Sequence, residues 1–125
     1  MQNNKIVFKI GSVELTAIAR DTMTAKVILS ALPIHSNAQT WGEEVYFSIP
    51  VNAPLESNAR DIVNPGEVAF WVEGSCIAIG FGPTPISQGD EIRLAAATNI
   101  WADIEGDVRD LTNAQPHDTV IVDWE

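Results

Sequence analysis

Residues 67–81 read EVAFWVEGSCIAIGF and form two short apolar runs on either side of Gly74. In the second run the side chains alternate in size, because Ile77, Ile79 and Phe81 are bulky and the residues between them are small. Successive side chains of a strand point to opposite faces of a sheet, so this alternation is typical of a strand with one bulky face. The stretch therefore predicts a β-hairpin at the centre of the fold.

Alternation extends outward from this hairpin toward the N-terminus. Apolar residues recur at every second position in 6–10 and again in 13–18, and Gly11 and Ser12 separate the two runs. Two alternating runs joined by two such residues are typical of a tight hairpin. Further strands are expected at residues 94–101 and 119–124, with two short ones within 34–49, where Gly42 marks a bend or bulge.

One segment has the periodicity of a helix. Its apolar positions fall at i, i+3, i+4 and i+7, namely Ala25, Ile28, Leu29 and Leu32. Asp21 or Thr22 is a suitable N-cap, and Pro33 ends the helix. Shorter helical turns are expected within 59–63, before the Asn-Pro-Gly turn, and at the end of the acidic segment 103–110.

Length and composition suit one globular domain spanning residues 1–125, because 46% of the residues are hydrophobic and 19% are charged. Many short strands, Gly and Pro turns and a single helix predict a mainly β fold. We expect a small, closed or nearly closed β-barrel, mostly antiparallel, with one clear α-helix and short helical turns. Closing the sheet would leave no exposed strand edges.

Charge and hydropathy narrow the range of partners. Seven Lys and Arg against 17 Asp and Glu give a net charge of −10, which repels phosphate, so we expect no nucleic-acid partner. The longest apolar run is 68–72, far short of the roughly 20 residues that span a bilayer, so we expect no membrane partner. The first residues lack the apolar core of a secretory signal and Cys76 is the only cysteine, which favours a cytoplasmic protein.

Several stretches carry a resemblance to a known family. Residues 40–48 read TWGEEVYFS, 66–71 read GEVAFW and 79–87 read IGFGPTPIS. In order and spacing they resemble a family of short, uncharacterised prokaryotic proteins with a cyclophilin-like barrel, and the likeness continues through 97–100 and 104–107. The resemblance implies a small barrel of mostly antiparallel strands with helical cover. The family is defined by sequence and structure, so the resemblance implies no particular reaction.

True cyclophilins catalyse rotation about X-Pro bonds, whose uncatalysed barrier is ~18–20 kcal/mol. In those enzymes an arginine on a barrel strand donates a hydrogen bond to the substrate amide region. The corresponding stretch here, 44–48, contains no arginine, so no catalytic residue is carried over. A proline isomerase with a substituted active site stays as an alternative, in which Arg60 or Arg93 on a flanking loop reaches the substrate.

Aromatic side chains are the main candidates for ligand binding. A groove lined by them accepts a proline ring or another flat apolar group, and ordinary core packing is the competing interpretation. Because neighbours on a strand face opposite sides, only one of Phe70 and Trp71 can reach such a groove. The predicted ligand-binding residues are Trp41, Glu43, Tyr46, Phe70, Phe81, Thr84 and Trp101.

The two polar members of this set lie in loops or at strand ends. Glu43 and Glu44 follow Trp41 and Gly42, an arrangement that suits a cation or a protonated amine, although solvated surface charge is the competing interpretation. Adjacent strand residues diverge, so the two glutamates do not form a paired acid–base site. Thr84 offers a hydroxyl from a Gly-Pro-Thr-Pro loop that either covers the groove or only makes a turn.

The sequence lacks the patterns of metal and cofactor sites. The acidic run 103–110 departs from a calcium loop, because Gly106 occupies the fourth position of the loop instead of the sixth. His35 and His117 are far apart in sequence, and Cys76 lies in an apolar strand without a basic neighbour. We expect no metal, no cofactor and no catalytic residue.

Three functions remain after these observations. Aromatic residues without a catalytic arginine favour an uncharacterised cyclophilin-like protein that binds a peptide or a small ligand without catalysis. The first alternative is the peptidyl-prolyl isomerase with a substituted active site. The second is an acidic subunit that meets a basic partner, which the net charge of −10 favours. The sequence assigns no oligomeric state.

Overall fold

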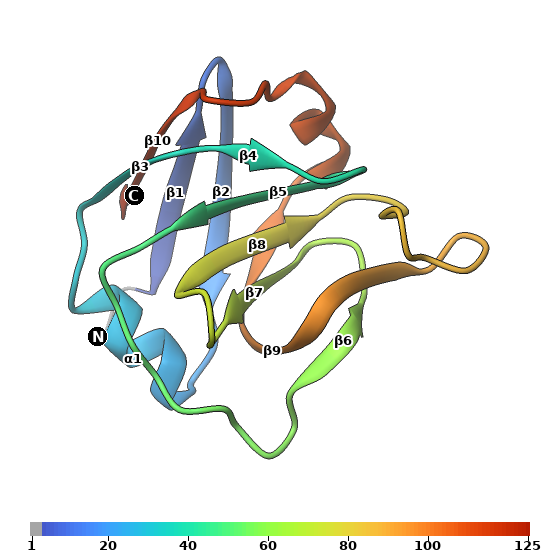
Figure 1. The fold of residues 1–125 in the computed structure, drawn as a ribbon. Coiled ribbons are helices and arrows are strands. Elements are labelled where there is room, and N and C mark those ends of the chain that lie inside the picture. The colour runs from blue at the N-terminus through green and yellow to red at the C-terminus, as the bar shows by residue number, and fades with distance from the viewer. Residues whose placement is uncertain (1–3) are drawn as a thin grey trace.

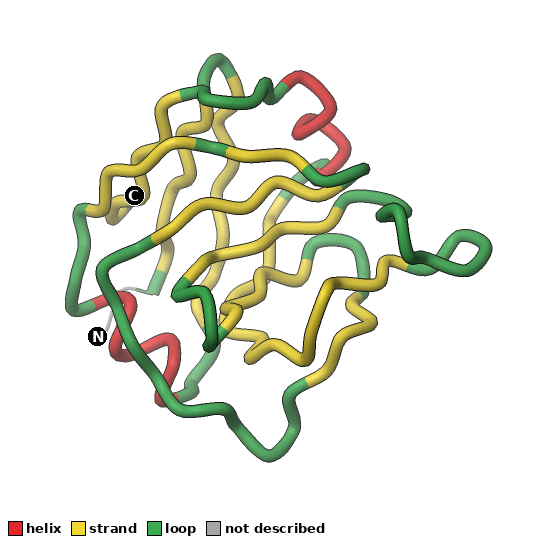
Figure 2. Tube along the Cα trace, viewed as in Figure 1, coloured by secondary structure: helices red, strands yellow, loops and turns green. Residues whose placement is uncertain are grey.

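The computed structural model describes residues 4–125, which form a twisted sheet (Figure 1). Its strands are β1 (Lys5–Ile10), β2 (Val13–Ala19), β3 (Ile34–Asn37), β4 (Gln39–Thr40), β5 (Glu44–Ser48), β6 (Arg60–Val63), β7 (Glu67–Trp71), β8 (Cys76–Gly80), β9 (Ile92–Glu105) and β10 (Thr119–Trp124). The α-helix α1 (Met23–Leu29) and the 3-10 helix η1 (Val108–Asn113) lie at opposite ends of the molecule, as Figure 2 shows in red. Among the described residues, no helix is long and apolar enough to cross a bilayer.

The strands of this sheet are hydrogen-bonded in the order β3-β10-β1-β2-β9-β7-β8-β5-β4, and β6 pairs with β9 beside this path. The pairs along the path are antiparallel, from β10 with β3 to β4 with β5. The mainly β, antiparallel fold with one clear α-helix is therefore confirmed.

The two ends of the hydrogen-bonded path, β3 and β4, are consecutive in the chain and only Ala38 separates them. The backbone of Ala38 continues the pairing toward β10, because its N–H donates to the Asp118 carbonyl and its carbonyl accepts from the His117 N–H. Residues 34–40 thus pair with β10 in their first part and with β5 in their last. The sheet is not closed by hydrogen bonds between its two end strands, so the closed barrel stays a prediction.

The long strand β9 joins two parts of the structure. Its C-terminal part pairs with β2 and β7, and its N-terminal part pairs with the short strand β6. The register with β7 shifts between Val68 and Ala69, and the register with β6 shifts between Arg60 and Ile62. Such irregularities bend a strand. In Figure 1, the N-terminal part of β9 curves away below β7 and lies between β7 and β6.

The main core lies between the layers of this curved sheet. Phe8 packs against Phe47 and Trp101, with ring centroids 6.4 and 6.2 Å apart. All three side chains are almost fully buried, and Ile77 and Ile79 of β8 join the same core. Burying apolar area of this kind is the main favourable contribution to folding.

The opposite face of β8 belongs to a second, smaller cluster. Its members are Val63, Ala69, Ala78, Ile92, Leu94 and Ile100, and Tyr46 packs against them. On this face Ala78 presents only a methyl group, whereas on the other face Ile77 and Ile79 fill the main core. The alternation in residues 76–81 therefore sets a bulky face against the main core and leaves room on the other side.

Most of the expected elements are confirmed. The hairpins formed by β1 with β2 and by β7 with β8 are present, as is β10. The helix begins after Thr22, whose hydroxyl accepts a hydrogen bond of 3.0 Å from the Ala25 N–H. A short helical segment, η1, follows the acidic turn.

Two expectations were wrong, and a third element is longer than expected. Residues 59–63, expected as one helical turn, contain strand β6, because pairing with β9 decides their conformation: the Thr98 hydroxyl donates to the Arg60 carbonyl at 2.9 Å. Residues 34–49 hold three strands instead of two, because the strand is interrupted at Ala38. The strand expected at 94–101 is present and is longer than expected, because pairing with β6 and β2 extends it to Ile92–Glu105.

Candidate ligand-binding site

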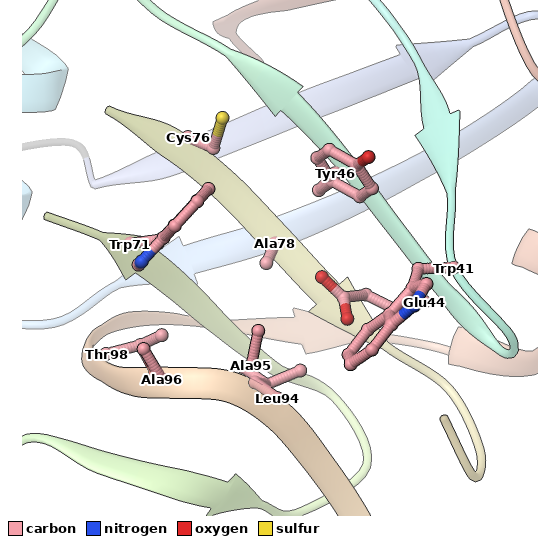
Figure 3. Close-up of a pocket in the computed structure, with 10 residues that line it drawn as sticks. All are labelled: Trp41, Glu44, Tyr46, Trp71, Cys76, Ala78, Leu94, Ala95, Ala96 and Thr98. Atoms are coloured by element: carbon pink, nitrogen blue, oxygen red, sulfur yellow. The ribbon is translucent and has the colours of Figure 1, made fainter. Parts of the chain in front are cut away.

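A pocket of about 210 Å³ opens on the outer face of β8. It is lined by Trp41, Glu44, Tyr46, Trp71, Cys76, Ala78, Leu94, Ala95, Ala96 and Thr98. Figure 3 shows Ala78 between Trp71 on one side and Glu44 with Trp41 on the other, while β9 borders the lower edge. The pocket thus joins the small face of the central hairpin to the curved part of β9.

Close backbone contacts hold the aromatic walls in place. The Trp41 N–H donates to the Glu44 carbonyl at 3.0 Å, which closes the turn between β4 and β5. At the other wall, the Trp71 ring lies directly on Gly74, where a Cβ atom would come within 2.3 Å of Cε3. A glycine at this position therefore lets the indole ring approach the hairpin backbone closely.

Glu44 is the carboxyl group of this pocket. Its side chain is almost enclosed, with 6% of the residue exposed, and its Oε1 is buried without a hydrogen-bond partner. Burial disfavours the charged form and raises the pKa of Glu44 to about 7. The first residue of β5 thus places a carboxyl group that changes charge near neutral pH in an otherwise mostly apolar wall.

Two other polar groups of the pocket, the Cys76 thiol and the Trp71 indole N–H, carry no charge that could pair with the Glu44 carboxyl. Burial, and secondarily the charge of Glu44, raises the pKa of the Cys76 thiol, so it is protonated at neutral pH. The Trp71 indole N–H is buried without a hydrogen-bond partner. None of the residues that line the pocket is a lysine, an arginine or a histidine.

The structure brings together two of the seven residues predicted to bind a ligand, Trp41 and Tyr46, which both line the pocket. Phe70 and Trp101 lie in the main core and are 0% exposed. Phe81 also packs in that core, where the Arg109 guanidinium lies 5.6 Å from its ring centroid.

The two polar candidates also lie away from the pocket. The Glu43 carboxylate pairs with Arg109 at 2.7 Å. The Thr84 hydroxyl is buried and donates to the Arg93 carbonyl, while its N–H donates to the Ser87 hydroxyl at 2.9 Å. The Glu43 side chain thus ties the turn before β5 to η1, and the Thr84 side chain ties the loop after β8 to the start of β9.

Sequence reasoning missed Glu44, Trp71 and the small residues of β9. Strand parity was the available signal, because it allows only one of Phe70 and Trp71, and only one of Glu43 and Glu44, to face a given side. The structure selects Trp71 and Glu44 for the pocket. No local pattern in the sequence distinguishes the Ala95 and Ala96 wall from any other short apolar run.

The arginines of the described chain all form ion pairs outside this pocket. Arg20 and Arg60 both contact Glu67, at 3.1 and 2.6 Å, and Arg20 also contacts Asp103. Hydrogen bonds from Arg60, the Asn64 N–H and Arg20 lower the pKa of Glu67 to about 2. Arg93 contacts Glu91 and Asp61. These pairs tie strands and loops together, and none of these arginines lines the pocket.

A wider depression of about 660 Å³ adjoins the pocket. It is lined by His35, Ser36, Asn37, Gln39, Tyr46, Phe47, Ser48, Ile49, Pro50 and Cys76. Tyr46 and Cys76 border both spaces. Within residues 4–125, no group of three His, Cys, Asp or Glu side chains is arranged to hold a metal ion.

Comparisons with known proteins identify a family and a solved structure to which this chain is similar. A model of the family described as cyclophilin-like matches residues 4–123. The chain is also similar to a hypothetical protein from Archaeoglobus fulgidus with a known solution structure, at 32% sequence identity and a TM-score of 0.83. That match covers 98% of this chain and 95% of the archaeal chain. A search of curated proteins found no match.

Proposed function

The chain belongs to the cyclophilin-like family, and we propose that it is a non-catalytic binding module whose pocket between β5, β8 and β9 receives a small ligand or one side chain of a peptide. The observation that carries the proposal is a concave, mostly apolar pocket with a buried carboxyl oxygen and an indole N–H that lack partners. Ligand sites commonly combine apolar walls with a few such polar groups.

The unpartnered polar atoms support the proposal of a ligand, because burying them without hydrogen-bond partners costs free energy. A buried polar group that gave up its water hydrogen bonds costs about 1–3 kcal/mol when nothing replaces them. Glu44 Oε1 and Trp71 Nε1 are in this state on the walls of one pocket. A ligand that offers a donor to Glu44 recovers part of this cost as binding free energy.

The arrangement of the arginines supports binding without proline isomerisation. The substituted-donor alternative needs Arg60 or Arg93 beside the substrate. Arg60 is engaged by Glu67, and Arg93 by Glu91 and Asp61. The pocket walls hold no guanidinium group that could stabilise a twisted amide.

The test is an NMR titration of the labelled protein with three compact probes: cyclopentanol, N-acetylpyrrolidine and pyrrolidine. We expect saturable shifts of amide signals from β5, β8 and the N-terminal part of β9 with at least one probe. Ala96→Leu, which fills the pocket from β9, should abolish them.

The matched control is Ala97→Leu, the same substitution at the next residue, which does not line the pocket. It should leave the shifts unchanged, and the amide spectra of both variants report whether the fold survives. No saturable shift with any probe, or equal shifts in both variants, would overturn the proposed function.

A further inference from the structure

We propose that the ligand is a compact organic cation, an alkylated ammonium group, held by the Glu44 carboxylate between the side chains of Trp41, Tyr46 and Trp71. This inference rests on the proposed function, because it names the ligand class of the same pocket.

The carboxyl group provides the first argument. Glu44 is 6% exposed and lines the pocket, and its Oε1 has no donor from the protein. In Figure 3 its carboxyl oxygens lie over the pocket beside Trp41 and above Leu94. A buried carboxylate is stabilised by an opposite charge or by hydrogen-bond donors. No lysine, arginine or histidine lines this pocket, so a cationic ligand would supply the charge that its walls lack.

Aromatic side chains provide the second argument. Trp41, Tyr46 and Trp71 line the same pocket, with the two tryptophans on opposite sides of Ala78 in Figure 3. The faces of aromatic rings attract cations, and cages of such rings bind quaternary ammonium groups. A carboxylate beside several aromatic rings is thus a suitable site for an ammonium group whose alkyl groups contact the rings.

Charge selects a cation over an anion. No lysine, arginine or histidine lines the pocket, so an anionic ligand finds no opposite charge. Arg109 lies near the start of β5, but its guanidinium is engaged by Glu43 at 2.7 Å. The net charge of −10 also attracts cations toward the whole surface.

Volume limits the ligand to a small head group. The pocket measures about 210 Å³, which is below the ≈ 300–1,000 Å³ typical of sites for drug-sized ligands. A compact ammonium group fits this space, and its source is either a free small molecule or a modified side chain. The two sources share the chemistry of the head group and differ in what extends beyond the pocket.

The cation should bind more tightly as pH rises. The Cys76 thiol, whose pKa is raised by burial, is uncharged near neutral pH, and no lysine, arginine or histidine lines the pocket. The neighbouring strand β4 contains only Gln39 and Thr40. Glu44 therefore controls the charge that the ligand meets. Below its pKa the carboxylate fraction falls about tenfold per pH unit, and the affinity for a cation falls with it.

The experiment compares choline with the neutral alcohol in which carbon replaces the ammonium nitrogen. In calorimetry at about pH 8, we expect saturable choline binding at least about tenfold tighter than that of the alcohol, and about tenfold weaker choline binding at about pH 6. A blocked lysine derivative with a trimethylated ammonium group tests the side-chain source, because tighter binding than choline would identify a peptide ligand.

Glu44→Gln should weaken choline binding at least about tenfold and leave binding of the alcohol unchanged. Glu43→Gln is the matched control, because that carboxylate pairs with Arg109 outside the pocket, and it should leave choline binding unchanged. If Glu44→Gln fails to fold, the pH dependence of choline binding to the wild-type protein still tests whether the Glu44 carboxylate holds the cation.

Equal binding of choline and the alcohol would overturn the cation proposal and leave the binding module intact. The same holds if choline fails to bind while a neutral probe of the earlier titration does bind. If no probe binds in either experiment, both the cation proposal and the proposed function are wrong.

Discussion

Two adjacent glutamates show how the position of a single residue decides its chemistry. Glu43 lies in the turn before β5 and reaches outward to Arg109, whereas Glu44 begins the strand and is enclosed by the pocket. The Glu43 carboxylate forms an ion pair at the surface. The Glu44 carboxyl is buried without a partner, and burial raises its pKa. The side of the strand on which a carboxyl lies therefore separates a surface contact from a candidate binding group.

Glu44 should make the protein less stable as pH rises. Its folded-state pKa of about 7 lies above the ordinary value of 4.5, so the folded protein holds this proton more tightly than the unfolded chain does. The free energy of unfolding should therefore fall as pH rises from 4.5 through about 7, by roughly 3 kcal/mol at most at 1.36 kcal/mol per unit.

Glu44→Gln should remove this decline and give a protein more stable than wild type above neutral pH. Urea denaturation at several pH values measures it, with Glu43→Gln as the control that keeps the decline. Equal slopes in wild type and Glu44→Gln would contradict the assignment.

Glu67 should have the opposite effect on the pH dependence of stability. Arg60, Arg20 and the Asn64 N–H all donate to its carboxylate, whose side chain is only 8% exposed. Because the pKa is lowered to about 2, the carboxylate stabilises the fold above the ordinary value of 4.5, and this contribution is lost as pH falls toward 2.

Glu67→Gln should lower the free energy of unfolding by about 1–3 kcal/mol at neutral pH, because it leaves two guanidinium groups without their shared partner. Glu105→Gln removes an exposed pair with Lys5 at 3.5 Å and should cost less than about 1 kcal/mol. Similar losses in both variants would show that the enclosed carboxylate has no special role.

At the scale of elements, the turn between β4 and β5 and the curved strand β9 make the pocket. The turn places Trp41, β5 carries Glu44 and Tyr46, and β9 supplies the small wall opposite. The Phe81 N–H donates to the Glu43 carbonyl at 2.8 Å, and the Glu43 N–H to the Pro83 carbonyl at 3.0 Å. These bonds join the turn to the loop after β8.

Gly42→Ala should destabilise this turn in two ways, through the positive φ of residue 42 and through crowding of the added Cβ atom. Gly42 has a φ of +59°, and a Cβ atom there would lie 2.9 Å from the Thr84 Cα and 2.8 Å from the Pro85 Cδ. Gly89→Ala is the matched control, because Gly89 has a φ of +64° and no atom within 4 Å of an added Cβ.

Both substitutions should cost about 1–2 kcal/mol for the left-handed conformation. Only Gly42→Ala should cost at least about 1 kcal/mol more, through crowding against backbone, and weaken ligand binding through Trp41. Thermal denaturation and the probe titration measure the two effects. Equal losses of stability and affinity in both variants would contradict the proposed role of the turn.

At the scale of the molecule, a fold of the cyclophilin-like family carries a pocket with a carboxyl group and no arginine. The family match and the archaeal structure cover nearly the whole chain. The ion pairs of Arg20, Arg60 and Arg93 join strands and loops around the sheet. The fold is thus compatible with the proposed binding role, in a pocket that carries a carboxyl group and lacks the arginine that true cyclophilins use.

This difference predicts no acceleration of X-Pro isomerisation. In a protease-coupled assay, the rate should equal the uncatalysed rate at every protein concentration, because no pocket residue donates a charged hydrogen bond to the amide. A known cyclophilin is the positive control. A rate proportional to protein concentration would contradict a purely binding role, and its loss in Arg60→Lys or Arg93→Lys would identify the donor.

The sequence predicted the hairpins well, because alternation in residues 6–18 and 67–81 reports which face is buried. It failed at residues 59–63, where pairing with β9 decides the conformation. The pocket was only partly predictable. Trp41 and Tyr46 followed from their residue types, whereas the choice of Trp71 over Phe70 depends on strand register and on the curvature of β9.

The most direct test of the account is the titration of the Glu44 side-chain carboxyl carbon by NMR, with and without choline. In the free protein we expect a pKa of about 7, caused by burial without a partner. Saturating choline should lower that pKa, because a cation that binds the carboxylate favours the charged form. An ordinary pKa in the free protein, or no change with choline, would contradict the account.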